Sequence, residues 1–484
     1  MSISGALSNA LTGLTATARA AEVVSSNLSN IMTDGYGRRE VSLSSQNYRS
    51  SGGVMVNAIK RYSNPVILAE RRMADSAFGQ LSSLNSAYQQ IEKLMGTPDQ
   101  ANSLSGMVVS LESSLITASG SPGNTTRLKN VAVDAEALAQ TFNNASQGVQ
   151  DLREQADRSI EDMVGRLNTL LTRTQEMNRD ISTAINKGFG TASLEDDRQR
   201  ILDEISELVP VRQIARDRGA IALYTTNGAV LLDGSAVEIE FTPTPTIQPH
   251  MTVDNGLLDG LCINGIEIRI ESDTGALSGG ALGAQFEIRD ELALQTQADL
   301  DAGARSLIER FQSTTTDPTL SAGEAGLFTD SGAAFDASDE TGLAGRLRLN
   351  TLVAPDGAGE FWRLRDGLGA TAPGDVGDAS ILTGLGTALS GDVQPSSGSF
   401  ASDVLSMAGL ADRILSAQSS NRVISDEDLS FAATKLSGLE AMELAEGVDS
   451  DHEIQQLMLI EQAYAANARV VEAIDEMMNQ LLRL

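Results

Sequence analysis

Apolar and small residues recur every seven positions between Ile3 and Ile31. Alternating steps of three and four residues place two such rows on one face of an α-helix. The only charged residues between Met1 and Thr33 are Arg19 and Glu22, although a helix in water usually carries many Glu and Lys side chains. The pattern therefore predicts a helix that is surrounded by other protein. The residues predicted to form its contact rows are Ile3, Leu7, Leu14, Ala21, Val24, Leu28 and Ile31.

A second helix with the same repeat is predicted at the C-terminal end. Ser450 and Glu453 have the spacing of a capping box, which predicts that the helix begins there. Asn467 is the one polar residue in its rows, and a buried Asn in such a seam fixes the register of the paired helices. The predicted contact residues of this helix are Leu457, Ile460, Tyr464, Asn467, Val471, Ile474, Met478 and Leu481.

The chain between these ends carries further helical repeats. Apolar residues recur every seven positions over 125–187 without an intervening Pro, and the second row of that repeat shifts near Ala156. Shorter repeats predict helices over 67–95, 286–311 and 403–444, which could complete a bundle with the long helix.

Two stretches have the character of strands and loops. Asn227-Gly228 lies between two apolar runs and predicts a β-hairpin, because both residues tolerate positive φ. Residues 237–241 and 266–272 alternate between apolar and polar side chains, as half-buried strands do. The Gly- and Asp-rich residues 313–400 predict loops with short strands.

These patterns predict a multidomain α+β protein, with a terminal α-helical coiled coil and a long-helix bundle that carries inserted β-rich outer domains. The predicted division is a terminal coiled-coil inner domain, a helical bundle domain, a β-rich insertion, and a second irregular or β-rich insertion. Their respective boundaries are 1–33 with 448–484; 34–208 with 284–312 and 401–447; 209–283; and 313–400.

Composition narrows the possible partners. The formal net charge of −30 argues against nucleic acid as a partner. No run of about 18 apolar residues is present, so no membrane insertion is expected. Cys262 is the only cysteine, which excludes an intramolecular disulfide. No secretory signal pattern occurs at the N-terminus, so we expect either a cytoplasmic protein or export without a cleaved signal peptide.

The sequence gives little support to catalysis. The two histidines, His250 and His452, lie far apart in the sequence. The run HEIQQ begins like a zinc-binding HExxH motif, but Gln456 occupies the position of the second ligand. No phosphate-binding glycine motif opens a helix. We therefore expect no enzymatic activity, no cofactor and no metal.

A basic segment interrupts this acidic chain. Between Arg38 and Arg72 there are seven basic residues and two acidic ones. One interpretation is a solvated loop and helix face; the other is an interface in which Arg38 and Arg39 contact an acidic surface of a neighbouring copy. The terminal helices have two interpretations as well. Each could pack within its own monomer, or the two could pair and then pack against other copies, in which case the ends would fray in a lone chain.

The run SSNLSNIMTDGYGRREV, residues 25–41, resembles the N-terminal signature of the bacterial flagellar axial proteins, in which an Asn-rich helix end leads into a Gly-Tyr turn. Asp34 stands where that family often has Pro. Residues 446–484 are similar to the ending of the hook-associated junction proteins (FlgK) within this family, from which Glu446, Asp449 and His452 depart. The helix from Phe286 is also similar to their central helix.

This resemblance implies a structural role in the flagellum. The termini would form an inner layer along the flagellar channel, the bundle would surround it, and the β-rich domains would face outward. The implied partners are other copies of the chain, the hook protein, the second hook–filament junction protein, and a dedicated export chaperone on the C-terminal helix. The implied location is extracellular, at the hook–filament junction, after export by the flagellar type III apparatus.

Other functions stay open at this point. The chain could be a different axial component, such as a hook or distal-rod protein, because these share the N-terminal signature. A more distant alternative is a secreted enzyme or adhesin that is carried on the flagellum.

Overall fold

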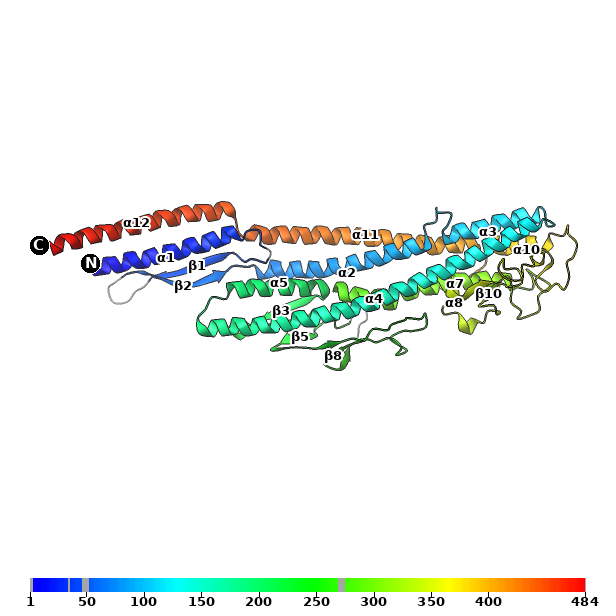
Figure 1. Ribbon diagram of the computed structural model, residues 1–484, viewed down its shortest axis with the longest axis horizontal. Helices are drawn as coiled ribbons and strands as arrows, with labels where there is room; N and C mark the ends of the chain where they lie inside the picture. Colours follow the sequence, from blue (N-terminus) through cyan, green and yellow to red (C-terminus); the bar gives the residue numbers. More distant parts are fainter. Residues whose placement is uncertain (1–2, 34, 46–51, 269–274, 484) are drawn as a thin grey trace.

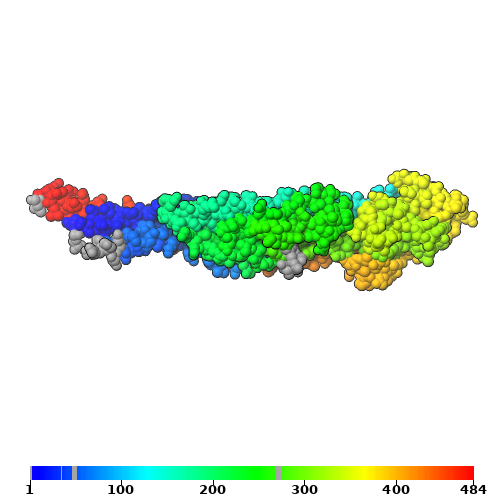
Figure 2. Space-filling view, turned by 90° about the horizontal axis from the view of Figure 1, so that it is seen from below, coloured from blue at the N-terminus to red at the C-terminus, as the bar shows by residue number. Residues whose placement is uncertain are grey.

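The computed structural model describes residues 3–33, 35–45, 52–268 and 275–483. The molecule is an elongated rod whose two chain ends lie at the same end (Figure 1). In the space-filling view the N- and C-terminal segments form the narrow end, and the middle of the chain forms the rest (Figure 2). Asp34 and part of the strand predicted over 266–272 lie outside the described residues.

Long helices run along the rod. α4 spans Thr125–Lys187, as predicted. The Asn124 side chain accepts hydrogen bonds from the first-turn backbone N–H groups, and Gly188 ends the helix in the left-handed conformation. The other helices are α1 (Ile3–Ser29), α2 (Pro65–Met95), α3 (Leu104–Ser119), α5 (Ala192–Leu208), α6 (Gly280–Glu287), α7 (Ala293–Phe311), α8 (Leu343–Arg346), α9 (Arg363–Asp366), α10 (Ser380–Ser390), α11 (Met407–Glu446) and α12 (Ser450–Leu482).

Several helix predictions are confirmed and others were incomplete. The helices predicted over 67–95, 286–311 and 403–444 correspond to α2, to α6 and α7 with an intervening π-turn over Ile288–Leu292, and to α11. The sequence patterns did not single out α3 and α5. α10 lies in a stretch predicted to hold only loops and short strands, so the prediction was wrong there.

The strands form small antiparallel sheets. The hairpin predicted at Asn227-Gly228 is confirmed: β4 pairs with β5, and Gly228 has a φ of 93°. Together with the long helices, these sheets confirm the α+β class. The sheets are β1 (Arg39–Ser45) with β2 (Val54–Arg61); β3 (Val211–Ala215), β4 (Ile221–Thr225), β5 (Val230–Asp233) and β6 (Ser235–Ala236); β7 (Ile239–Glu240), β8 (Leu261–Ile263) and β9 (Ile266–Ile268); and β10 (Phe328–Asp330) with β11 (Leu347–Leu349).

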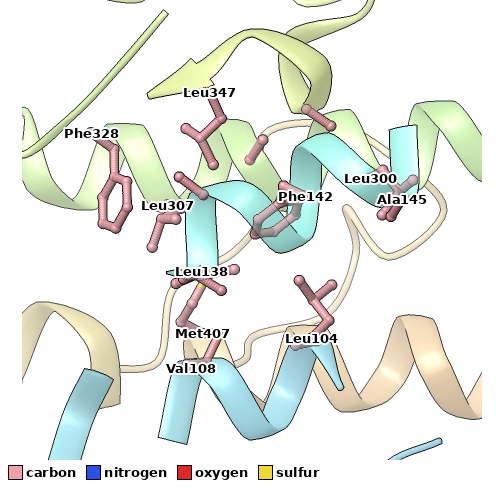
Figure 3. Packing of buried hydrophobic residues seen from close by; sticks show 14 of the residues in the cluster. Leu104, Val108, Leu138, Phe142, Ala145, Leu300, Leu307, Phe328, Leu347 and Met407 are labelled. Atoms are coloured by element: carbon pink, nitrogen blue, oxygen red, sulfur yellow. The ribbon is translucent and has the colours of Figure 1, made fainter. Parts of the chain in front are cut away.

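One hydrophobic core fills the half of the rod that is farther from the chain ends. Figure 3 shows Phe142 of α4 among side chains of α3, α7 and α11, which include Leu104, Leu307 and Met407. Phe142 and Leu104 are almost completely buried. The heptad repeat of α4 is explained by this packing, because its apolar stripe faces several helices at once.

A second core begins at Ile160 and lies between α4, α5 and the sheet of β3–β6. A buried polar layer separates it from the first core, at the place where the heptad repeat of α4 shifts. Asp157 and Arg289 form an ion pair of 2.5 Å, and Arg153 Nε donates to the Arg289 carbonyl at 3.0 Å. Burial lowers the pKa of Arg153 to about 10. The shift in the repeat thus marks a change from apolar to ionic packing.

The polar layer continues toward the second insertion. Gln150 donates to Gln297 at 2.9 Å, and Gln297 donates to Asp301 at 2.9 Å. Asp301 accepts from the backbone N–H groups of Gly342 and Ala344 at 2.7 and 2.8 Å. This chain of bonds ties the second inserted region to α4 and α7.

Candidate assembly interface

The helices at the two chain ends lie side by side at the narrow end of the rod (Figure 1). α1 buries mainly small residues, whereas α12, all of whose residues are described, buries only Glu453 and Ile474. The two helices therefore cover each other along one narrow seam.

The structure distributes the predicted contact residues over three environments. Val24 and Ile474 are buried. Tyr464, Met478 and Leu481 are exposed to 49%, 45% and 59%. The others are half-buried: Ile3, Leu7, Leu14, Ala21, Leu28, Ile31, Leu457, Ile460, Asn467 and Val471.

The seam of α1 is displaced from the predicted leucine row. Its buried residues are mostly small and lie beside that row: Ala10, Gly13, Ala16, Val23, Val24 and Asn27. A Cβ atom added at Gly13 would lie 2.9 Å from the amide of Asn467, so the two backbones approach closely there. The predicted contact residues included Val24 but otherwise consisted mostly of large apolar residues, which dominate a heptad count, while close helix approach favours small residues.

The outer face of α12 presents large apolar side chains. Met458, Leu459 and Leu482 are exposed to 56%, 65% and 81%, and Leu11 of α1 is exposed to 50%. Several exposed large apolar side chains on one helix indicate an interaction site in a soluble protein. The paired terminal helices thus leave apolar side chains exposed to solvent.

Glu453 connects the terminal pair to the hairpin of β1 and β2. The Glu453 side chain is fully buried; it pairs with Arg38 Nε at 2.7 Å and accepts from Asn27 Nδ2 at 3.1 Å. The predicted capping box was wrong, because Asp449 is the N-cap and accepts from the N–H groups of Asp451 and His452. Glu453 is instead a buried link between distant parts of the chain.

The Asn-rich signature has a local structural reason. Asn27 Nδ2 donates to the Arg39 carbonyl at 2.9 Å, and Asn27 Oδ1 accepts from Arg39 N at 3.0 Å and from the Tyr36 hydroxyl at 2.9 Å. One amide thus ties the end of α1 to the start of β1. Sequence reasoning noticed the motif but not that Asn27 organises it.

The basic segment is engaged within the chain. Arg39 and Arg61 both pair with Asp196, at 2.8 and 2.6 Å, and the Gly37 N–H donates to the same carboxylate at 2.9 Å. The described contacts of Arg38 and Arg39 are therefore internal. A contact of Arg38 and Arg39 with a neighbouring copy stays a prediction. It requires that these two guanidinium groups bind an acidic group of that copy in addition to Glu453 and Asp196.

Among the described residues, no group of three or more His, Cys, Asp and Glu side chains is arranged to hold a metal ion. His452 lies in the first turn of α12, with its Nε2 3.0 Å from Gln456 Nε2. No helix of the described chain is both long and apolar enough to span a membrane.

Comparison with known proteins places these features in a family. Residues 88–327 match the family model of the flagellar hook-associated protein FlgK helical domain. Residues 444–484 match the C-terminal model of the flagellar basal body rod FlgEFG proteins, and residues 7–36 match that of the flagella basal body rod protein.

Similar proteins carry the same description, and one of them aligns with nearly the whole chain. The chain is 22% identical over 512 aligned residues to flagellar hook-associated protein 1 of Bacillus subtilis (strain 168), covering 98% of this chain and 97% of that protein. It is 26% identical to flagellar hook-associated protein 1 of Salmonella typhimurium over 64% of this chain and 56% of the relative. The solved structure of the flagellar hook junction protein FlgK from Burkholderia pseudomallei is similar with a TM-score of 0.45 and 17% identity, over 55% of this chain and 46% of that one.

The helical-domain match, the two terminal matches and the full-length relative all point to flagellar proteins. The three family models match successive parts of the chain. This chain belongs to the family of the flagellar hook-associated protein FlgK.

Proposed function

We propose that this protein is a structural subunit of the bacterial flagellum that joins the hook to the filament, and that it is incorporated through its terminal helices. The observation that carries this proposal is the uncovered apolar face of α12, beside α1 at one end of the rod. Each large apolar side chain covered on assembly stabilises the complex by about 1.5–3 kcal/mol. Stacked copies would cover these side chains, and a lone chain cannot.

The proposed assembly interface comprises the residues predicted from the heptad rows, from Ile3 to Ile31 in α1 and from Leu457 to Leu481 in α12, together with the exposed apolar side chains of Met458 and Leu459. We propose the same four-part division as the sequence predicts, with 1–33 and 448–484 inside and the two insertions outside. The ends of α1 and α12 would fray before assembly, because their seam buries few large side chains.

The proposed neighbours are other copies of the chain, the hook protein on one side and the second junction protein on the other. Before export, the apolar face of α12 would bind a chaperone, since an amphipathic helix fits a hydrophobic groove. The proposed location is extracellular, after export without a cleaved signal peptide, and the proposed role is structural rather than enzymatic.

A hook or distal-rod protein is the second candidate, because both terminal segments match rod-family models. The match of residues 88–327 to the FlgK helical domain favours the junction role. The phenotype of a strain that lacks this protein distinguishes the junction role from a hook or distal-rod role. A strain without it should build hooks that lack filaments if the junction role holds, whereas absent or unfinished hooks would favour the alternative.

The role of the terminal pair needs a second experiment. Met458→Ser combined with Leu459→Ser removes two exposed apolar side chains of α12, and should leave the monomer folded while filament-bearing cells are lost. Ile116→Ser is the matched control, because Ile116 is 63% exposed on α3 at the far end of the rod. Normal flagellation by the α12 variant would contradict the proposed interface. Measuring chaperone binding and the secreted amount of each variant separates an export defect from an assembly defect.

A further inference from the structure

A cavity of about 930 Å³ lies in the body of the rod, between the start of α2, α5 and β3. α2 runs between α11 and α5 in this region (Figure 1). Lys435 of α11 also lines the cavity. A volume of this size admits several side chains of a partner.

The lining is cationic although the chain as a whole is strongly acidic. Two acidic residues line the cavity, Glu70 and Glu195. The basic residues of the lining are Arg61, Arg72, Arg198, Arg212 and Lys435. A positive concave surface in a chain with a net charge of −30 attracts the acidic groups of other molecules.

Buried donors of this cavity lack acceptors. Arg72 is 5% exposed; its Nε and Nη1 donate to Asp203 and Gln213 at 2.9 and 3.0 Å, but its Nη2 has no hydrogen-bond partner among the described residues. Gln199 is 6% exposed, and its Nε2 is likewise without a partner in the described chain. Buried donors are rarely left unpaired, and these two belong to side chains that line the same cavity.

Arg198, which also lines the cavity, has hydrogen-bond acceptors for its Nη1 but no carboxylate among them. It is 8% exposed, and its Nη1 donates only to neutral oxygens, at 2.9 Å to Asn178 Oδ1 and 2.7 Å to the Gly219 carbonyl. Burial lowers the pKa of Arg198; Glu195 opposes this effect, while Arg61 and Arg72 lower the pKa further.

The chain's own carboxylates behind the cavity are already shared. Asp203 pairs with both Arg71 and Arg72, as Asp196 does with Arg39 and Arg61. Arg212 and Lys435 are exposed, and within the described parts of the chain neither makes an ion pair or hydrogen bond that would neutralise it.

We propose that this cavity is a carboxylate acceptor, filled in the assembled flagellum by an acidic side chain of a second copy of this chain. This inference rests on the proposed function, because it requires copies to pack together. Charge complementarity selects the occupant, because each copy carries 65 Asp and Glu against 35 Lys and Arg and so offers many carboxylates to a neighbouring copy. Packing such acidic copies requires local cationic sites, since like charges otherwise repel.

The surroundings of the cavity specify the occupant further. Phe431 lies one helical turn before Lys435 and is 74% exposed, and Val66 at the start of α2 is 63% exposed. A segment that places an acidic residue beside an apolar one would therefore satisfy both the cavity and its rim.

Carbodiimide coupling tests the proposal, because it joins a lysine amine to a carboxylate only when the two are in contact. The chain has five lysines, Lys60, Lys93, Lys129, Lys187 and Lys435, so the products can be assigned by mass spectrometry. We would treat purified monomer and isolated intact flagella in parallel. The expected result is a product that links Lys435 to an acidic peptide of this chain, at least tenfold enriched in flagella over monomer.

Variants in the same flagella make the test specific. Arg212→Glu should reduce the Lys435 product at least fivefold, whereas the charge reversal Lys187→Glu, at the exposed end of α4, should leave it unchanged. Inorganic phosphate, titrated into the monomer and followed by NMR, probes a free anion as the occupant.

The remaining outcomes overturn the proposal. A chain found at the junction without an enriched Lys435 product would refute the acceptor site and leave the proposed function standing. A product that links Lys435 to a different flagellar protein would exclude a second copy as the occupant. Tight phosphate binding with no such product would identify a small-anion site instead, and absence of the chain from hook–filament junctions would refute the proposed function and this inference with it.

Discussion

α4 and α12 carry the same kind of seven-residue repeat, yet the structure uses them in opposite ways. α4 is buried along a stripe that runs from Leu128 to Ile181, while α12 buries only Glu453 and Ile474. α4 contacts helices and sheets on several sides, and α12 contacts mainly α1. A seven-residue repeat therefore predicts that one face of a helix will be buried. It does not tell whether the same chain or another molecule buries that face.

α4 and α12 therefore differ in what stabilises them. Helices in proteins owe most of their stability to tertiary packing, so α4 is stable in the monomer. α12 has little packing of its own, so under the proposed function neighbouring molecules would stabilise it. The body of the rod is thus packed within the monomer, whereas the end formed by α1 and α12 is packed only in part.

The largest expected effect lies in the polar layer of the body. Asp157→Ala leaves the buried guanidinium of Arg289 without one of its two carboxylates and should lower the free energy of unfolding by about 3–5 kcal/mol. Urea denaturation measures this loss. Asp162→Ala, at an exposed position of the same helix, should change stability by less than about 0.5 kcal/mol. Equal effects of the two would show that the layer is not a structural element.

A matched pair of leucines tests the comparison directly. Leu138→Ala in α4 removes a completely buried side chain and should cost about 2–5 kcal/mol in the free energy of unfolding. Leu459→Ala in α12 removes one that is 65% exposed and should cost less than about 0.5 kcal/mol in the monomer. Similar losses in monomer denaturation would mean that α12 is packed in the lone chain after all.

Glu453→Gln tests the link between the two regions. It removes a charge-assisted hydrogen bond with Arg38, of a kind worth about 1.5–3 kcal/mol. Amide hydrogen exchange in α1 and α12 should accelerate about tenfold or more, while the denaturation midpoint of the body stays the same. Glu461→Gln, at an exposed position of α12, is the control and should leave exchange unchanged. A variant in which only the body is destabilised would refute this role.

The smallest expected effect is a pH dependence confined to the body. Burial raises the pKa of Asp301 to about 6, despite hydrogen bonds from Ala344 and Gly342 that lower it. A raised pKa means that the folded chain holds this proton more tightly than the unfolded chain does. The contribution of Asp301 to stability is therefore fully present below its unfolded pKa of about 3.9, and it is lost as pH rises through about 6.

Between pH 5 and pH 8 this loss should amount to about 1 kcal/mol of unfolding free energy. Asp301→Asn should flatten the dependence in denaturation curves recorded across that range. Hydrogen exchange in α12 should not follow the same titration, because Asp301 lies in the body. A pH profile identical in the original chain and the variant would exclude Asp301 as the titrating group.

Sequence patterns predicted much of the fold because they depend on local periodicity. The bounds of α4 follow from an unbroken repeat between the cap at Asn124 and Gly188, and the hairpin at Asn227-Gly228 follows from turn chemistry. α10 was missed because its short, Gly-containing stretch owes its helical form to packing on α3 and α7.

By itself, the sequence determined the paired heptad repeats at the two ends, the long helix between them and the acidic surface, because each is a property of neighbouring residues. Only the tertiary structure decided that Glu453 is a buried partner of Arg38 and Asn27 rather than a cap, and that cationic residues from α2, α5, β3 and α11 surround one cavity. These contacts join residues that are far apart in the chain, and their partners are selected by how the helices pack, which no local pattern encodes.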